Sequence, residues 1–299
     1  MEECKLVYKV KRLIKQLGLP RWLHKYGPKT YETWHHLLAL TVKSLCNLSY
    51  RFVVSFLRSL GFKCPAKSSL QDFAQKKLSQ QLLRKILLIL VKNKVYIAAV
   101  DSTCLQRTNP SYYYITKVGK IKRRIPVKFS ALVDTEGRKF IDAVIRVLPA
   151  HDSKDGYSMI KRARISIKKI VGDKAYDSNK IHEECYAKGI EAHIPIRNYG
   201  KRVRHNKSSK RRLAQKHFNK RIYHRRSIIE SMFHAFKKRF GDYVRSKKAR
   251  MIRIEIYLKM IAYNLFFWFI WRFRTHPLLT FRIFLEIIDL KKINIRNFK

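Results

Sequence analysis

Apolar positions recur with helical spacing through the first ninety residues, as in YETWHHLLALTVKSLCNLSYRFVVSFLRSLGF, and no strand pattern interrupts them. A break at KCPAKSS separates two helices, and Ser68 or Ser69 is the candidate cap of the second. These patterns predict a helical domain over residues 1–90. Its scattered basic side chains fit a DNA-reading helix-turn-helix and a plain helical bundle equally well, so both interpretations stay open.

From residue 95 the pattern changes to short apolar runs rich in β-branched residues. VYIAAVDST, VKFSALVD and KFIDAVIRVLP predict a strand followed by a hairpin with TEG as its turn. Helical spacing returns in DSKDGYSMIKRARI, before the apolar run KKIVGDKAY, and again in DSNKIHEECYAKG, before IEAHIPI. The predicted order is β-β-β-α-β-α-β, within a domain over residues 91–245.

The C-terminal segment, residues 246–299, contains one strongly apolar run. MIAYNLFFWFIW covers residues 260–271, between Lys259 and Arg272. A membrane span needs about 20 residues, so this run is too short and predicts a buried helix in a helical segment. Attachment to a membrane surface is the disfavoured alternative, and no membrane partner is predicted.

The chain is strongly basic, with 67 Lys and Arg residues against 20 Asp and Glu and a net charge of +47 over 299 residues. This charge predicts a polyanionic partner, because phosphates neutralise the self-repulsion and released counterions drive association. Disorder is the alternative, but 46% hydrophobic and 12% aromatic residues suffice for a buried core.

Lys and Arg are densest within residues 197–222, between the last predicted strand and a helix that begins near residue 223. This stretch is either a phosphate clamp beside the functional site or an ordinary solvated loop. The clamp interpretation makes Lys210, Arg211 and Arg212 DNA contacts.

Cysteines and the N-terminus indicate the compartment. The five cysteines are odd in number and include no C-x-x-C pair, which argues against a disulfide framework and a structural zinc site. The N-terminus MEECKLVYKVKRLIK has acids first and no apolar core of a secretory signal. We therefore expect a reduced, cytoplasmic setting, in association with the nucleoid.

Three acids are candidates for chemistry. Asp101 and Asp173 follow the apolar runs AAV and IVG, where a side chain emerges from the end of a buried strand into a cleft. A single aspartate in such a place is more often a turn former or a helix cap. Glu230 lies on the helix YHRRSIIESMFHAFKK, and there a surface ion pair with Arg226 or Lys237 is the simpler interpretation.

If the three acids meet, a divalent metal explains them together. Hard cations such as Mg²⁺ prefer carboxylate oxygen and are commonly shared with substrate phosphates. Two such ions about 3.5 to 4 Å apart activate the attacking hydroxyl and stabilise the leaving oxygen in phosphoryl transfer. A protein that only binds nucleic acid would instead leave the three acids scattered in space.

These residues resemble the DDE-class transposases of insertion sequences. The spacing Tyr223-x2-Arg226-x3-Glu230-x6-Lys237 matches at all four positions the signature around the third acid in the insertion-sequence-four group. The order of elements is similar over residues 95–245. The resemblance implies an α/β fold, an RNase H-like mixed five-stranded sheet flanked by helices, with helical N-terminal and C-terminal segments.

The resemblance also implies two groups of site residues. The metal-binding catalytic triad would be Asp101, Asp173 and Glu230, with Mg²⁺ or Mn²⁺ as cofactor. The residues that contact transposon-end DNA or orient the glutamate would be Tyr223, Arg226 and Lys237. His151 and Asp152 in PAHDS resemble a less specific element of the family and stay outside the triad.

The implied activity is metal-dependent strand cleavage and strand transfer at the ends of an insertion sequence. Its partners would be the terminal inverted repeats and target DNA, with the protein assembled as a homo-oligomer on DNA. Many relatives carry a large β-rich insertion where this chain has only residues 197–222, so hairpin intermediates are not implied. The alternatives are a metal-dependent RNase H-like nuclease and a non-enzymatic nucleic-acid-binding protein.

Overall fold

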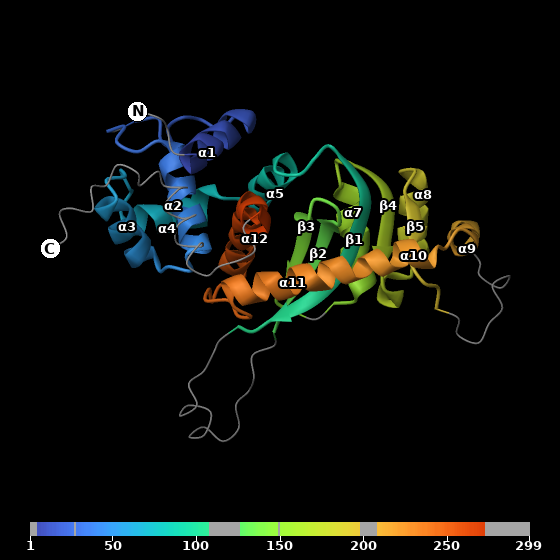
Figure 1. Ribbon diagram of the computed structural model, residues 1–299. Helices are drawn as coiled ribbons and strands as arrows, with labels where there is room; N and C mark the ends of the chain where they lie inside the picture. Colours follow the sequence, from blue (N-terminus) through green and yellow to red (C-terminus); the bar gives the residue numbers. More distant parts are fainter. Residues whose placement is uncertain (1–4, 27, 108–125, 149, 198–207, 273–299) are drawn as a thin grey trace, which may run out of the picture. The chain divides into compact units, whose positions relative to one another are not determined.

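The computed structural model describes residues 5–26, 28–107, 126–148, 150–197 and 208–272 (Figure 1). The chain divides into two compact units. The first unit contains residues 1–86 and the chain from Ile261 onward, and the second unit is Leu87–Met260. The predicted division into domains 1–90, 91–245 and 246–299 stays a prediction.

The first unit is helical over its described part, as the sequence predicts. Its elements are α1 (Lys5–Gln16), α2 (Thr33–Leu45), α3 (Tyr50–Ser59), α4 (Lys67–Asp72), a π-helix (Phe73–Lys77) and the start of α5 (Gln80–Ile89). Most residues of α2 are buried, and Leu38 and Leu40 lie in the core. Among the described helices none is by itself long and apolar enough to cross a membrane, and only the bent pair α2 and α3 meets the length and composition criteria together.

The predicted cap of the fourth helix is wrong. Helix α4 begins at Lys67 with Ala66 as its N-cap, and no side chain caps it. Ser68 and Ser69 therefore lie inside the first turn. The Ser69 hydroxyl instead forms a 3.2 Å hydrogen bond with Nε2 of the buried His36, which joins α4 to α2.

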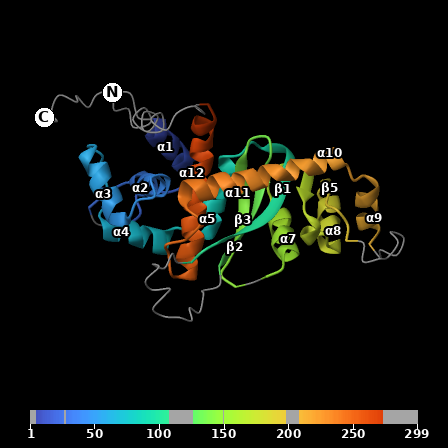
Figure 2. The same cartoon turned by 60° about the horizontal axis from the view of Figure 1, so that its bottom comes forward.

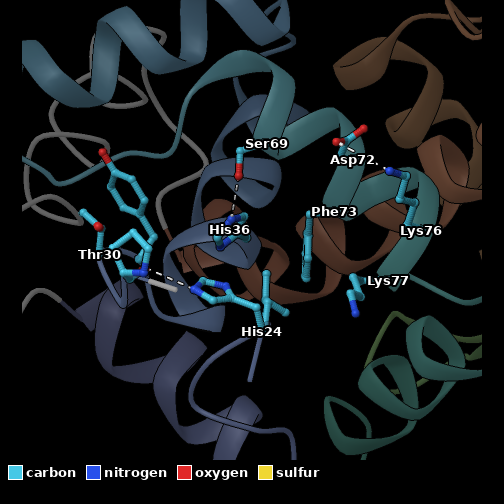
Figure 3. A pocket seen from close by; sticks show the side chains of 11 residues that line it. His24, Thr30, His36, Ser69, Asp72, Phe73, Lys76 and Lys77 are labelled. Atoms are coloured by element: carbon cyan, nitrogen blue, oxygen red, sulfur yellow. Dashed lines mark hydrogen bonds and ion pairs between the residues drawn. The ribbon is translucent and has the colours of Figure 1, made fainter. Parts of the chain in front are cut away.

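A pocket of about 310 Å³ lies in this unit (Figure 3). The buried side chains of His36 and Phe73 line it, and the exposed Lys76 and Lys77 come from the π-helix. Burial lowers the pKa of His36, so its imidazole is neutral at pH 7. Asp72 also lines the pocket and lies 3.8 Å from the ammonium of Lys76, so the charges at its edge partly offset one another.

The second unit is built on a mixed five-stranded sheet. Its strands are β1 (Lys94–Leu105), β2 (Val127–Asp134), β3 (Lys139–Arg146), β4 (Ser166–Gly172) and β5 (Glu191–His193), arranged in the order β3-β2-β1-β4-β5. Strand β1 is antiparallel to β2 and parallel to β4, while β5 is parallel to β4. This confirms the predicted order of elements and the hairpin beside the first strand.

Two layers of helices cover the sheet (Figures 1 and 2). Helices α7 (Asp152–Arg162) and α8 (Asn179–Ala187) cover one face, where Met159 and Ile181 pack with Val100 and Leu132. Helix α11 (Ser227–Phe240) crosses the other face. Because side chains alternate along a strand, β2 serves both layers.

Phenylalanines fix α11 against the hairpin. The Phe129 ring of β2 lies 5.4 Å, centroid to centroid, from both Phe233 and Phe236 of α11. Phe140 of β3 lies 5.6 Å from Phe236. All four rings are buried, and Phe236 is fully so. Edge-on and tilted ring pairs add to the energy of burial, so this cluster determines where the polar face of α11 stands.

The buried C-terminal helix is present as α12 (Ala249–Arg272). Residues Met260–Leu265 of the predicted apolar run are buried, and the side chains of 266–271 lie outside the described residues. Within the second unit, the Tyr257 hydroxyl of α12 donates a 2.7 Å hydrogen bond to the carbonyl of Ala143 on β3. The beginning of α12 therefore closes the edge of the sheet beside β3.

The aromatic cluster yields a stability prediction. Phe236→Ala leaves a cavity among fully buried rings, so we expect a loss of about 3 to 5 kcal/mol in the free energy of unfolding of the unit that contains the sheet. Urea unfolding followed by circular dichroism measures it. His234→Ala, at an exposed position of the same helix, should change stability by less than about 0.5 kcal/mol. Equal effects of the two substitutions would show that the rings do not anchor α11.

Candidate active site

The pairing of β1 with β4 places the two aspartates side by side. These parallel strands are paired up to Val100 and Gly172, so Asp101 and Asp173 are the next residues on adjacent strands. Gly172 permits a close approach, because a Cβ at this position would lie 2.9 Å from Cγ1 of Val100. Asp173 directly follows the carboxyl end of β4, where side chains of an α/β sheet gather for function. Asp101 lies inside β1, which continues to Leu105 because β2 pairs with it that far, so the expectation that Asp101 ends a strand is wrong.

Asp173 also caps the turn that follows it. Its Oδ1 accepts a 2.5 Å hydrogen bond from the amide of Ala175, at the start of the 3₁₀ turn Lys174–Tyr176. This is the capping role that the sequence left open. The bond holds the carboxylate at the end of β4, so capping and a role in the site are compatible.

Arg226 connects Glu230 of helix α11 to Asp101 of strand β1. The segments α10 (Lys220–Tyr223), the 3₁₀ turn His224–Arg226 and α11 follow one another along the sheet (Figure 1). One terminal nitrogen of Arg226 lies 3.2 Å from Oδ2 of Asp101, and the other lies 2.7 Å from Oε1 of Glu230. A single guanidinium therefore joins two acids that are far apart in sequence.

The ion pair between Arg226 and Glu230 that the sequence predicts is present, and Arg226 has a second acidic partner on β1. Arg226 and Glu230 are four residues apart, an arrangement worth about 0.2 to 0.5 kcal/mol on an exposed helix. The Glu230 side chain is 52% exposed, but those of Arg226 and Asp101 are only 25% and 16% exposed. The contact with Asp101 on β1 is the part that a surface ion pair does not explain.

Electrostatics show that the three acids share one neighbourhood. Burial is the main reason why the pKa of Asp101 is raised, and the charges of Asp173 and Glu230 raise it further. The Ser102 amide and Arg226 act in the opposite direction. For Arg226, burial disfavours the charged form, but Glu230, Asp101 and then Asp173 outweigh it, so its pKa is raised. The arginine supplies the cation that this group of carboxylates requires.

No three His, Cys, Asp or Glu side chains in the described parts of the chain are already grouped as ligands around one point. The donor chemistry nevertheless fits a hard divalent cation, because Asp101, Asp173 and Glu230 offer carboxylate oxygens and their charges act on one another through Asp101 and Arg226. Arg226 holds two of them in its fork.

The other residues of the predicted signature lie along the same path. Tyr223 is half-buried, with its ring 5.6 Å from Phe218. Lys237 is half-buried on α11, about two turns beyond Glu230. Both residues therefore lie on the continuous helical segment, from α10 to α11, that also contains Arg226.

The basic stretch is partly a helix. Residues 198–207 lie outside the described residues, but Lys210, Arg211 and Arg212 lie on α9 (Ser209–Lys216). Arg211 binds the buried Asp177 through two nitrogens, with Nε 2.9 Å from Oδ1. The ammonium of Lys210 lies 3.4 Å from the ring centroid of Tyr186 on α8. Arg211 therefore anchors α9 to the segment that contains Asp177. Residues 209–216 form a helix and not a solvated loop.

Three residues beside the site were missed as functional candidates, and a fourth, Asp152, was noted only as part of a less specific element of the family. Ser102, Lys128, Asp152 and Tyr176 come from β1, β2, α7 and the turn after Asp173. Lys128 could have been noticed, because a lysine within the apolar strand VKFSALVD needs a buried partner. Ser102 and Tyr176 gave no local signal.

Comparison with known proteins identifies the family. A search of solved structures finds the piggyBac transposase synaptic complex with hairpin DNA, with 11% sequence identity, a TM-score of 0.38, and coverage of 87% of this chain and 72% of that one. The family model of the transposase DDE domain matches residues 93–265, more than half of the chain. The matched region contains the whole sheet and all three acids. The chain belongs to this family and is a DDE-class DNA transposase.

Proposed function

We propose that this transposase cleaves and joins DNA strands at the ends of an insertion sequence with Asp101, Asp173 and Glu230 as its metal-binding triad. The observation that carries the proposal is the single guanidinium of Arg226 on both Asp101 and Glu230, beside the strand end that bears Asp173. DDE transposases use divalent metals, and we assign Mg²⁺ or Mn²⁺ here. When bound, such ions activate the attacking hydroxyl and stabilise the leaving oxygen.

The residues of the chain prepare the site in distinct ways. Ser102 donates its amide to Oδ1 of Asp101 and so leaves Oδ2 directed at Arg226. Asp101, Asp173 and Glu230 would hold the ion, and the fork of Arg226 can donate two hydrogen bonds to a DNA phosphate. Tyr223 and Lys237 flank this position along the α10–α11 path and are proposed as contacts to the transposon end.

The partners follow from the charge and the chemistry. A net charge of +47 supports binding to both the terminal inverted repeats and the target DNA. Each chain supplies one triad while an element has two ends, which supports a homo-oligomer assembled on DNA. We propose a cytoplasmic protein associated with the nucleoid. Hydrolysis alone would describe a nuclease, so the defining product is a strand joined to a second DNA.

Glu230→Gln tests the triad. The substitution is isosteric and removes one charge that a metal needs, while every basic contact to DNA stays. We expect cleavage and joining of linear end DNA to a plasmid to fall by orders of magnitude. Affinity for DNA, measured by fluorescence anisotropy, should be unchanged or slightly higher because one repulsive charge near the phosphates has gone.

The matched control is Asp242→Asn, which removes an acidic charge at an exposed position shortly after α11. It should cleave and join at the rate of the parent. If the Glu230→Gln protein also joins transposon ends at the parent's rate, Glu230 is only the helix partner of Arg226, and the triad as proposed is wrong.

A second test concerns α9. We expect Lys210→Ala with Arg212→Ala to flatten the dependence of log K for end DNA on log salt, by about 0.9 for each phosphate that these two side chains neutralise. Arg211 stays unchanged in this variant because it binds the buried Asp177. Anisotropy titrations between 50 and 200 mM salt, about the range where such slopes are steep, give the measurement. An unaltered slope would place α9 away from the DNA.

A further inference from the structure

Ser102 connects Asp101 to a neighbouring helix. Its amide donates a 2.8 Å hydrogen bond to Oδ1 of Asp101, and its hydroxyl donates a 2.7 Å bond to Oδ1 of Asp152. Asp152 is the first residue of α7, on the face of the sheet opposite α11. One serine thus links the first acid of the proposed triad to a fourth carboxylate.

Lys128 holds this fourth carboxylate in place. Its ammonium lies 2.7 Å from Oδ1 of Asp152, 2.5 Å from the carbonyl of Ala150 and 3.4 Å from Oδ2 of Asp155. The lysine side chain is only 14% exposed, and that of Asp155 is fully buried. Burial disfavours the charge of Asp152, but the bonds from Lys128 and Ser102 outweigh it and lower its pKa. Asp152 is therefore ionised and fixed from two sides.

Tyr176 is buried close to the same acids. Its ring is buried, and a Cβ on Gly156 of α7 would lie 2.6 Å from it. Among the described residues its buried hydroxyl has no hydrogen-bond partner. Burial chiefly raises the pKa of Tyr176, and Asp152, Asp101 and Asp173 raise it further. Asp152 thus belongs to the electrostatic neighbourhood of the proposed triad.

A simpler role for Asp152 is structural. An acid in the first turn of α7 interacts favourably with the helix dipole, which is worth about 0.3 to 1 kcal/mol. That role explains the carboxylate and its ion pair with Lys128. It does not require the hydrogen bond from the Ser102 hydroxyl to Asp152, which connects β1, next to Asp101, with α7.

We propose that Asp152, held by Lys128, is a positioning residue that acts on Asp101 through Ser102. The hydroxyl bond fixes Ser102, the Ser102 amide fixes Oδ1 of Asp101, and Oδ2 is thereby directed toward the cation. The inference rests on the proposed triad. Residues that orient a metal ligand in this way typically change metal affinity or activity about 10- to 100-fold when they are removed.

The experiment compares single and double variants on transposon-end DNA. Ser102→Ala and Asp152→Ala should each raise the Mn²⁺ concentration at half-maximal cleavage by about 10- to 100-fold, with DNA affinity unchanged. Direct Mn²⁺ binding to the protein–DNA complex, measured from the electron paramagnetic resonance signal of the free ion, should weaken in parallel. The double variant should be no worse than either single variant, because both break the same connection.

Conservative variants separate positioning from other roles. Ser102→Thr keeps the hydroxyl, and Asp152→Asn keeps the acceptor oxygen, so both should retain most of the Mn²⁺ affinity. Ser158→Ala removes a hydroxyl that, within the described parts of the chain, donates to the Lys154 carbonyl of the same helix, and it should have no effect. Thermal unfolding shows whether each variant is folded. Variants that melt earlier but bind Mn²⁺ as the parent does would reduce Asp152 to its structural role and overturn the proposal.

Asp101→Asn distinguishes this inference from the proposed function. If Asp101→Asn is inactive while Ser102→Ala binds Mn²⁺ normally, the triad stands and the positioning role of Asp152 is wrong. If Asp101→Asn cleaves at the parent's rate, the triad itself is wrong. If Asp152→Asn loses Mn²⁺ binding as completely as Asp152→Ala, Asp152 contacts the metal itself, and positioning through Ser102 is likewise wrong.

Discussion

Carboxylates brought together on the adjacent central strands of a sheet and on the helix above it repel one another, and the site depends on the cation that offsets this repulsion. Arg226 is that cation here, with one nitrogen on Asp101 and the other on Glu230. The interaction couples β1 to α11, two elements far apart in the sequence. We propose that the arginine serves two partners, the acids and a DNA phosphate, and that a divalent ion at the acids would favour the second.

The fold positions the residues that take part in this interaction. Parallel pairing of β1 with β4 determines the positions of Asp101 and Asp173, and the phenylalanine cluster determines the position of α11. Phe233 and Phe236 face the sheet, so Glu230, which is half-exposed, lies on another side of the helix. Hydrophobic packing thus places an acid whose function is electrostatic, and the two properties belong to different faces of one helix.

The sequence predicted what local patterns encode. The order of strands and helices, the TEG turn and the end of α8 before Gly189 follow from apolar periodicity and turn residues, and the structure has them. The signature of Tyr223, Arg226, Glu230 and Lys237 led to the family, which the match over residues 93–265 shows. Helix ends were less predictable, because α4 starts at Lys67 through packing and without a side-chain cap.

Contacts between distant residues gave no such signal. The hydrogen bond from Ser102 to Asp152 joins residues 50 positions apart, and that from Arg211 to Asp177 joins residues 34 apart. Nothing periodic marks either pair, so Arg211 was expected to face DNA although it binds a buried acid. In a chain with so few acids, each buried carboxylate selects one of many cations, and only the fold decides which.

The central claim is that Asp101, Asp173 and Glu230 together bind the metal and that Arg226 pairs with Asp101 and Glu230 in its absence. A crystal structure of the protein with transposon-end DNA and Mn²⁺ tests it most directly, because anomalous scattering locates the ion. The account predicts Mn²⁺ bound by oxygens of all three carboxylates, with Arg226 moved from Asp101 and Glu230 to a DNA phosphate. Mn²⁺ bound elsewhere, with Arg226 still between the two acids, would contradict it.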